Sequence, residues 1–213
     1  MGKIVTNDLW SSYFYEGTNV LKNNYDEKDF DKLKKIEVNI SFEKLMELRE
    51  NNADYSFSKE YLKQLHRYIF ESVYPFAGEY RVVNMMKLRG NFLFAKTTDD
   101  FDNYLDNLFE EVNRSLSACN SLAHFSSVLA SLYSKLIYCH PFREGNGRCI
   151  REFVREFSIY KSKELGIPVE LDWQLIDRSE LDRNIEISHL YPGLTNSLFL
   201  KALVPVEEKR IVK

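Results

Sequence analysis

The stretch "HPFREGNGRCIR", residues 140–151, combines a histidine, an acid, two glycines, an asparagine and three arginines. Pro141 disfavours the helical conformation at His140, so a preceding helix is expected to end there. Ile150, Phe153 and Phe157 then restore apolar side chains at helical spacing, which predicts a second helix starting inside the stretch. We therefore expect a turn between two helices, with its polar residues gathered where the second helix begins.

Helical periodicity also dominates the sequence on either side of this turn. The clearest apolar stripe lies over residues 121–139 and consists of Phe125, Val128, Leu129, Leu132, Leu136 and Ile137. Further helical patterns cover residues 27–37, 40–50, 58–73, 99–117, 147–163, 179–189 and 194–204. The predicted fold is therefore mainly α, with the helix over 121–139 at its centre.

Length and composition fit one globular domain over residues 1–213. Hydrophobic residues make up 44% of the chain and charged residues 29%, and there are only 8 glycines and 5 prolines. No internal repeat, low-complexity tract or linker divides the sequence. We therefore treat the chain as a single helical domain, in which residues 1–25 form an N-terminal segment.

Charge and cysteine content limit the partners and the location that we expect. The net charge is −3, so no general nucleic-acid or membrane binding is evident, and any phosphate recognition should be local. Cys119, Cys139 and Cys149 fit neither a metal-binding spacing nor a disulfide framework. With no secretory signal pattern at the N-terminus, a reducing cytoplasm is the simplest interpretation, and a translocated effector is the alternative.

One segment departs from the helical pattern. Residues 78–97, "GEYRVVNMMKLRGNFLFAKT", are rich in β-branched and aromatic residues and are broken at Arg89 and Gly90, which predicts a β-hairpin. A lone hairpin leaves exposed edges. The hairpin therefore either packs against the domain with no binding role, or is a flap that accepts an extended segment of another protein by strand addition.

The order of residues 144–151 predicts an anion site. "EGNG" stands directly before the second helix, where free backbone N–H groups and the helix dipole favour negative charge. Gly145 and Gly147 lack the Cβ atoms that would keep a phosphate from the backbone. Arg148 and Arg151 are three residues apart on one helix face and can clamp neighbouring phosphoryl groups, and Asn146 adds a neutral donor.

Glu144 and His140 complete the predicted chemistry. A carboxylate beside phosphate oxygens repels them directly but suits Mg²⁺, so we expect Glu144 to hold a magnesium ion that accompanies a nucleotide. His140, with an ordinary pKa of about 6.5, can take the proton of an incoming hydroxyl as that oxygen attacks phosphorus.

These residues resemble a known family. Residues 140–151 match the Fic motif, H-x-F-x-[D/E]-G-N-G-R-x-x-R, at every specified position. "LHRYIFESVYPFAGEYRVVN", residues 65–84, and "GTNVLKNN", residues 17–24, are similar to further family segments. The resemblance to Fic (Fic/DOC, Fido) proteins implies a mainly helical domain that transfers AMP from ATP to a Ser, Thr or Tyr hydroxyl of a target protein and releases pyrophosphate.

The resemblance also implies individual roles. His140 would be the base, Phe142 a core anchor, Glu144 the Mg²⁺ ligand, and Asn146 with the glycine-flanked backbone the phosphate cradle. Arg148 would bind the β-phosphate side and Arg151 the γ-phosphate. Doc-type relatives, which phosphorylate, replace the GNGR portion that this chain keeps, so AMP transfer is favoured. UMP or GMP transfer, AMP removal and a non-catalytic nucleotide-binding adaptor remain alternatives.

Two further segments carry predictions about partners. In the flap, Lys87, Asn91 and Phe92 are candidate contacts for the target protein, although "MMKLRGN" departs from the commoner family sequence. Near the N-terminus, Ser12, Glu16 and Gly17 match the inhibitory pattern [S/T]-x-x-x-E-[G/N], which Fic regulation uses in a separate antitoxin or in the enzyme itself. We expect these residues to form a helix whose Glu16 pairs with Arg151 and inhibits the enzyme.

Overall fold

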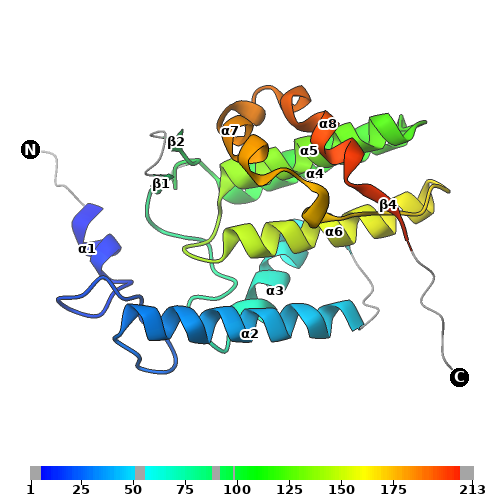
Figure 1. Cartoon of the computed structure of the whole chain (residues 1–213). Coiled ribbons are helices and arrows are strands. Elements are labelled where there is room, and N and C mark those ends of the chain that lie inside the picture. The colour runs from blue at the N-terminus through cyan, green and yellow to red at the C-terminus, as the bar shows by residue number, and fades with distance from the viewer. Residues whose placement is uncertain (1–5, 51–55, 88–91, 98, 207–213) are drawn as a thin grey trace, which may run out of the picture. The chain divides into compact units, whose positions relative to one another are not determined.

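The elements of the fold follow the order α1–α2–α3–β1–β2–α4–α5–α6–β3–α7–α8–β4 (Figure 1). The computed structural model describes residues 6–50, 56–87, 92–97 and 99–206. Within them the helices are α1 (Thr6–Ser11), α2 (Phe30–Glu50), α3 (Lys59–Phe70), α4 (Phe101–Ser117), α5 (Leu122–Cys139), α6 (Asn146–Glu164), α7 (Arg178–Ser188) and α8 (Asn196–Lys201). The mainly helical fold with a short hairpin is as predicted.

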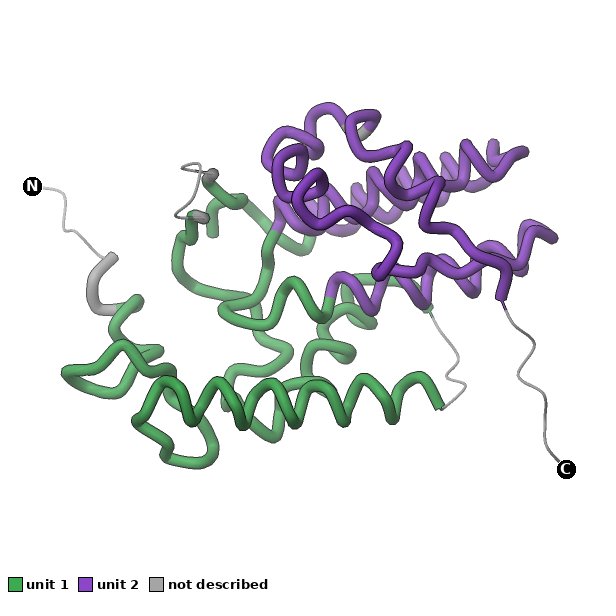
Figure 2. The backbone as a smooth tube through the Cα atoms, viewed as in Figure 1, with its two compact units in different colours: residues 1–102, 140–149 green, residues 103–139, 150–213 purple. Residues whose placement is uncertain are grey.

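The chain divides into two compact units, shown in green and purple in Figure 2. Unit 1 comprises residues 1–102 and 140–149, and unit 2 comprises residues 103–139 and 150–213. The start of α6 belongs to unit 1 and the rest of that helix to unit 2. The organisation of residues 1–213 as one domain stays a prediction.

In unit 1, α2 is one continuous helix where the sequence predicts two. Leu33, Glu37 and Ser41 are spaced four residues apart and are all buried. Two of these three positions on the inner face are polar, so the apolar stripe is interrupted, and its interruption predicted a helix end near residue 38. No proline or glycine occurs between Phe30 and Glu50, so nothing in the backbone ends the helix there.

The short helix α3 supplies the apolar wall of unit 1. Ser58 caps its N-terminus, where the hydroxyl accepts a hydrogen bond from the Tyr61 N–H at 3.3 Å. One face of the helix is fully buried and consists of Leu62, Leu65, His66, Ile69 and Phe70. His66 is the one polar residue among these five, and it lies close to the turn described below.

The predicted hairpin is present, although its paired part is shorter than residues 78–97. Strand β1 (Met86–Lys87) pairs antiparallel with β2 (Phe92–Leu93), in a register that sets Met86 opposite Leu93 and Lys87 opposite Phe92. Two of the expected target contacts, Lys87 and Phe92, thus face each other across the strands. The third, Asn91, lies outside the described residues.

Unit 2 is built around α5, as its apolar stripe predicts. Phe125, Leu129, Leu132 and Leu136 are fully buried, and α5 packs against α7 and α8. A second antiparallel pair, β3 (Val169–Leu171) with β4 (Leu203–Pro205), was not expected. The helix predicted over 194–204 therefore ends at Lys201, because the following residues pair with β3.

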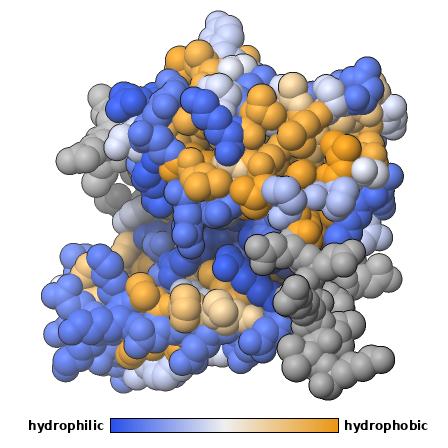
Figure 3. All heavy atoms as spheres, turned by 45° about the vertical axis from the view of Figure 1, so that its right-hand side comes forward, coloured by the Kyte–Doolittle hydropathy of each residue, from blue (hydrophilic) through white to orange (hydrophobic). Residues whose placement is uncertain are grey.

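The surface of the described residues carries apolar side chains. Figure 3 shows a broad apolar patch in the upper part of its view. The large exposed apolar residues of unit 2 include Leu122, Leu175, Ile187, Leu190, Tyr191, Leu194 and Leu200. None of the helices in the described ranges has the length and apolar character needed to cross a membrane.

Candidate active site

The turn over residues 140–145 is shaped by buried contacts in unit 1. His140 adopts a left-handed backbone conformation with φ of 45°, which is uncommon for a residue other than glycine. Phe142 is fully buried. The side chain of Asn146 accepts a hydrogen bond from the Phe142 N–H (2.9 Å) and donates one to the Phe142 carbonyl (2.7 Å). The Asn146 amide therefore closes the turn, and its predicted nucleotide contact remains a prediction.

His66 ties the turn to α3. Its Nδ1 accepts a hydrogen bond from the Gly78 N–H (2.9 Å), so its Nε2 carries the proton that is donated to the Glu144 carbonyl (2.8 Å). The imidazole also stacks on the ring of Phe142, with centroids 3.8 Å apart. Burial lowers the pKa of His66 to about 4, so it is neutral near pH 7 and keeps this tautomer.

The entry to the hairpin is attached directly to the turn. Tyr80 and Phe142 form an antiparallel β-bridge, and the Arg81 N–H donates to the Pro141 carbonyl at 2.8 Å. Such backbone pairing aligns the two chain segments irrespective of their side chains. The hairpin thus begins beside the predicted base.

The buried side chain of Arg81 strengthens this attachment. Its Nε donates to the His140 carbonyl and its Nη1 to the Val83 carbonyl, each at 2.7 Å, while Nη2 donates to the Ala95 carbonyl. Val83 precedes β1 and Ala95 follows β2. One guanidinium therefore joins both arms of the hairpin to the backbone of His140.

Phe94 brings the hairpin onto the imidazole itself. Its ring stacks on that of His140 with centroids 3.8 Å apart and an interplanar angle of 14°. A stacked ring restricts rotation of the imidazole and covers one of its faces. The hairpin therefore shapes the surroundings of the predicted base.

Glu144 provides the carboxylate expected beside a nucleotide phosphate. Its Oε1 accepts a hydrogen bond from the Gly145 N–H at 3.1 Å. Burial raises the pKa of the Glu144 carboxyl, and the nearby Glu37 carboxylate raises it further. A bound divalent cation would offset this cost of ionisation. Magnesium commonly uses one protein carboxylate together with substrate phosphates, so the donor chemistry of Glu144 fits Mg²⁺.

The two glycines of the motif have different surroundings. Gly145 has a φ of +78°, and a Cβ atom placed on it would overlap the ring of Phe70. Gly147 lies in the first turn of α6. The close approach that demands glycine at position 145 is thus made by Phe70, whereas the sequence suggested a phosphate.

The first motif arginine is held by α2. Arg148 donates from Nη1 to the Ser41 hydroxyl at 2.9 Å and from Nη2 to the Glu37 carboxylate. Its guanidinium lies 4.9 Å from the centroid of the Phe70 ring. The side chain is thus oriented by three separate groups of unit 1.

The second motif arginine, Arg151, belongs to unit 2. Its backbone carbonyl accepts a hydrogen bond from the indole of Trp173 at 3.0 Å. Its side chain lines a small cavity of about 100 Å³ together with Tyr133, Trp173 and Asp182. Its predicted contact with the γ-phosphate stays a prediction.

The prediction of a helix over residues 12–17 is wrong. Helix α1 ends at Ser11, and the chain then folds back on itself, with Phe14 bridged to Leu21. The Tyr15 N–H donates to the Val20 carbonyl, and Gly17 has a φ of +70° at the tip of this turn. Ser12 and Glu16 are exposed and do not share a helix face. Pairing of Phe14 with Leu21, later in the same segment, replaces the helix that the four-residue spacing suggested.

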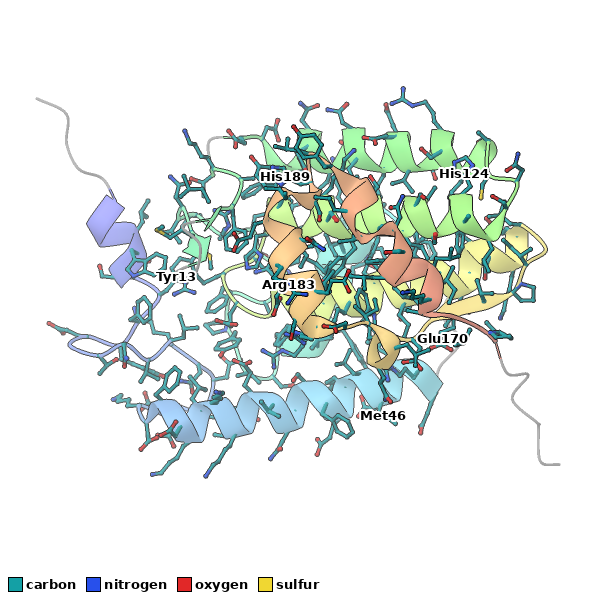
Figure 4. All side chains as sticks on the ribbon, turned by 45° about the horizontal axis from the view of Figure 1, so that its top comes forward. Tyr13, Met46, His124, Glu170, Arg183 and His189 are labelled. Carbon is teal, nitrogen blue, oxygen red and sulfur yellow. The ribbon has the colours of Figure 1, made fainter. Side chains whose placement is uncertain are left out.

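The N-terminal segment nevertheless contacts the motif, through aromatic residues. The guanidinium of the buried Arg143 lies over the rings of Trp10, Phe14 and Tyr13, at 4.5, 5.2 and 5.4 Å from their centroids. The Tyr13 hydroxyl also accepts a hydrogen bond from the Val82 N–H at 3.2 Å. Tyr13, labelled in Figure 4, therefore links the N-terminal segment to the start of the hairpin.

Several residues around the site were not predicted from the sequence. His66 and Arg81 lie within the family-like stretch 65–84, so the resemblance pointed to their neighbourhood without assigning them a role. Phe94, Glu37 and Ser41 carried no local signal, because each reaches the motif from a distant part of the sequence.

We predict that Gly145→Ala destabilises unit 1 much more than Gly17→Ala. Both glycines have a positive φ, which costs alanine roughly 1–2 kcal/mol. Only at Gly145 does the new methyl group also overlap a buried ring, which adds about 1–3 kcal/mol. Urea denaturation of the two variants measures the difference. Equal losses of unfolding free energy would contradict the packing role of Gly145.

Comparisons with known proteins identify related sequences. The Fic/DOC family pattern matches residues 56–158. The protein adenylyltransferase VbhT of Bartonella schoenbuchensis is 30% identical over 209 residues, which are 93% of this chain and 42% of VbhT. The probable protein adenylyltransferase y4lH of Sinorhizobium fredii is 30% identical over 156 residues, which are 71% of this chain and 77% of that protein.

Solved structures share the fold. The crystal structure of the BepC effector protein of Bartonella tribocorum, with bound AMPPNP, has a TM-score of 0.76 at 22% identity and covers 92% of this chain and 98% of its own. This chain spans less than half the length of VbhT. Its motif turn, its hairpin and its similarity to y4lH over most of both sequences show that the chain belongs to the Fic/DOC family.

Proposed function

We propose that this chain transfers AMP from ATP to a hydroxyl side chain of a target protein and releases pyrophosphate. The observation that carries the proposal is the position of His140. It lies in the turn that leads into α6, where free N–H groups at a helix start suit an anion, and the hairpin is fixed to it through Arg81 and Phe94. A base held between a place for phosphates and a strand edge suits transfer to a protein hydroxyl.

The proposed reaction needs one proton transfer and one displacement at phosphorus. His140 accepts the proton of the target hydroxyl, whose oxygen then forms a bond to the α-phosphorus of ATP. The bond between the α-phosphorus and the bridging oxygen breaks, and pyrophosphate leaves with the electron pair. The N–H groups of the first turn of α6, together with Arg148 and Arg151, would bind the phosphates.

Glu144 would hold the Mg²⁺ ion that accompanies ATP. The ion, when bound, offsets the negative charge of the phosphates. Glu144 suits this role because its carboxylate is already oriented by the Gly145 N–H, so little side-chain entropy remains to be lost on binding.

The comparisons support nucleotide transfer in particular. Two relatives that are 30% identical to this chain bear the name of protein adenylyltransferase, in one case as probable, and the BepC structure contains AMPPNP. Transfer of UMP or GMP, AMP removal and nucleotide binding without catalysis are the competing functions. Incubation with Mg²⁺ and each nucleoside triphosphate, labelled at its α-phosphate, distinguishes them. AMP transfer leaves the label of ATP on protein, and UMP or GMP transfer leaves the label of UTP or GTP. Nucleotide binding without catalysis and AMP removal leave no label on protein.

The target is proposed to lie along the hairpin as an added strand. Met86 and Leu93, which face each other in the register, are exposed, so this part of the hairpin is accessible. Main-chain pairing would place a target hydroxyl near His140, and Lys87, Asn91 and Phe92 stay the candidate contacts for the target. This mode of binding tolerates many target sequences, because the main chain provides most of the affinity.

Regulation through Glu16 stays a prediction, although the helix that was expected to present Glu16 is absent. An antitoxin that supplies an inhibitory helix from outside stays a prediction for this chain. The same labelled-ATP assay, with and without a candidate antitoxin, tests it.

We predict that His140→Ala abolishes AMP transfer while ATP affinity changes by no more than a few-fold. The imidazole acts on the target hydroxyl rather than on ATP, and loss of a general base costs about a hundred- to ten-thousandfold in rate. Single-turnover transfer from labelled ATP and calorimetric ATP binding give the two quantities. Transfer by the variant at the wild-type rate would exclude His140 as the base.

We predict that Glu144→Gln makes transfer require a higher Mg²⁺ concentration. The amide keeps the shape of the side chain but loses the charge that binds the cation. Transfer rates are measured across a magnesium titration, with thermal melting as the control for folding. An unchanged magnesium dependence would refute the role of Glu144.

We predict that Leu93→Pro reduces target modification more than it reduces ATP affinity. Proline removes a backbone N–H from β2 and disturbs the strand on which the target would pair. Leu93→Ser, which keeps the N–H, is the matched control for loss of the side chain. If the proline variant loses ATP affinity and target modification equally, the hairpin serves only as scaffold.

A further inference from the structure

Helix α2 directs two polar side chains at the motif, and both bind the same arginine. Glu37 and Ser41 are four residues apart and therefore share one face of the helix. The Ser41 hydroxyl accepts a hydrogen bond from Arg148 Nη1 at 2.9 Å, and the Glu37 carboxylate accepts one from Arg148 Nη2. The side chains of Arg148 and Glu37 are only 24% and 12% exposed, so the ion pair is largely shielded from water.

This arrangement fixes the plane of the guanidinium. A guanidinium is a rigid fork, so acceptors on both Nη atoms determine its rotation about the last bond of the side chain. The ring of Phe70 lies 4.9 Å from the guanidinium carbon and supports one face. A guanidinium has five N–H donors, and these two contacts leave others for an anion.

Glu37 is itself held in place. The Tyr74 hydroxyl donates a hydrogen bond to the Glu37 carboxylate, and Tyr74 is 3% exposed. Burial raises the pKa of Tyr74, and the Glu37 charge raises it further, so the phenol stays protonated and keeps donating at neutral pH. A carboxylate bound by a buried phenol and by an arginine has little freedom to leave when a ligand arrives.

We propose that Glu37 is a positioning residue that orients Arg148 to bind the phosphates of the nucleotide. This inference rests on the proposed function, in which Arg148 contacts ATP. The opposite role, in which Glu37 occupies the place of a phosphate and inhibits, is less consistent with the site. Ser41, a neutral group, shares the guanidinium, and Tyr74 fastens Glu37 to the core of unit 1, as expected for permanent support.

The test is nucleotide affinity in Glu37→Gln, measured by calorimetry with ATP and Mg²⁺. The amide keeps the shape but removes the charge, and losing an ionic hydrogen bond to Arg148 is expected to weaken ATP binding on the order of tenfold. AMP, which lacks the phosphates that Arg148 would contact, should lose less than twofold. Glu47→Gln, on the same helix and paired with Lys44, is the matched control and should leave ATP affinity unchanged.

A double-mutant cycle shows whether Glu37 acts through Arg148. In an Arg148→Ala background, Glu37→Gln should change ATP affinity less than twofold, because the group that it orients is gone. Three outcomes would overturn the proposal. Glu37→Gln could lose as much ATP affinity in the Arg148→Ala background as in the wild type, it could lose as much affinity for AMP as for ATP, or it could bind ATP more tightly. Should Glu37→Gln fail to fold in a melting experiment, Glu37→Asp decides, because its shorter side chain withdraws the carboxylate from Arg148. A loss of ATP affinity that disappears in the Arg148→Ala background supports the proposal, and no loss refutes it.

The proposed function fails in a different way. If the wild-type chain binds none of the four nucleoside triphosphates, the nucleotide site itself is wrong. If the wild type binds ATP and Glu37→Gln binds it equally well, the site stands and only the inference about Glu37 falls.

Discussion

The buried guanidinium of Arg81 is the contact on which the arrangement of the candidate site depends. A buried charge is costly unless hydrogen bonds satisfy it, and here three backbone carbonyls and the ring of Phe101, 4.9 Å away, surround it. These carbonyls belong to His140 and to the two arms of the hairpin. A lysine could not replace this arginine, because one ammonium group lacks the forked geometry that reaches three separated acceptors. His140 and the hairpin are therefore held together by one side chain.

Electrostatic balance organises the other side of the turn. Arg148 forms an ion pair with Glu37. Burial, and then the charge of Glu37, raise the pKa of Glu144, and the positive charge of Arg148 partly opposes this rise. A nucleotide bound with a magnesium ion would add negative phosphates and a positive cation to the group formed by Arg148, Glu37 and Glu144. The site is thus suited to a ligand that brings its own cation, because a bare polyphosphate would meet two carboxylates.

Much of this could be predicted from local sequence, and the failures have identifiable causes. The turn at His140 and the helix that follows were predicted correctly, because Pro141 and the apolar spacing act over a few residues. Helix α2 was divided wrongly because Glu37 and Ser41 occupy its buried face. The inhibitory helix failed because a spacing of four residues does not by itself make a helix, and the aromatic residues around Phe14 pair with a later part of the chain instead.

The sequence alone determined the helical class, the hairpin and the family motif, since each depends on residue types at short, regular spacings. Only the tertiary structure decided which side chains serve that motif. Four side chains contact it from other segments of the chain: Arg81, Phe94, Glu37 and Ser41. Local periodicity carries no information about contacts between distant segments. The tertiary structure also decided why Gly145 must be glycine: Phe70, far away in the sequence, packs where a Cβ atom would lie, because close packing of the core leaves no room for both.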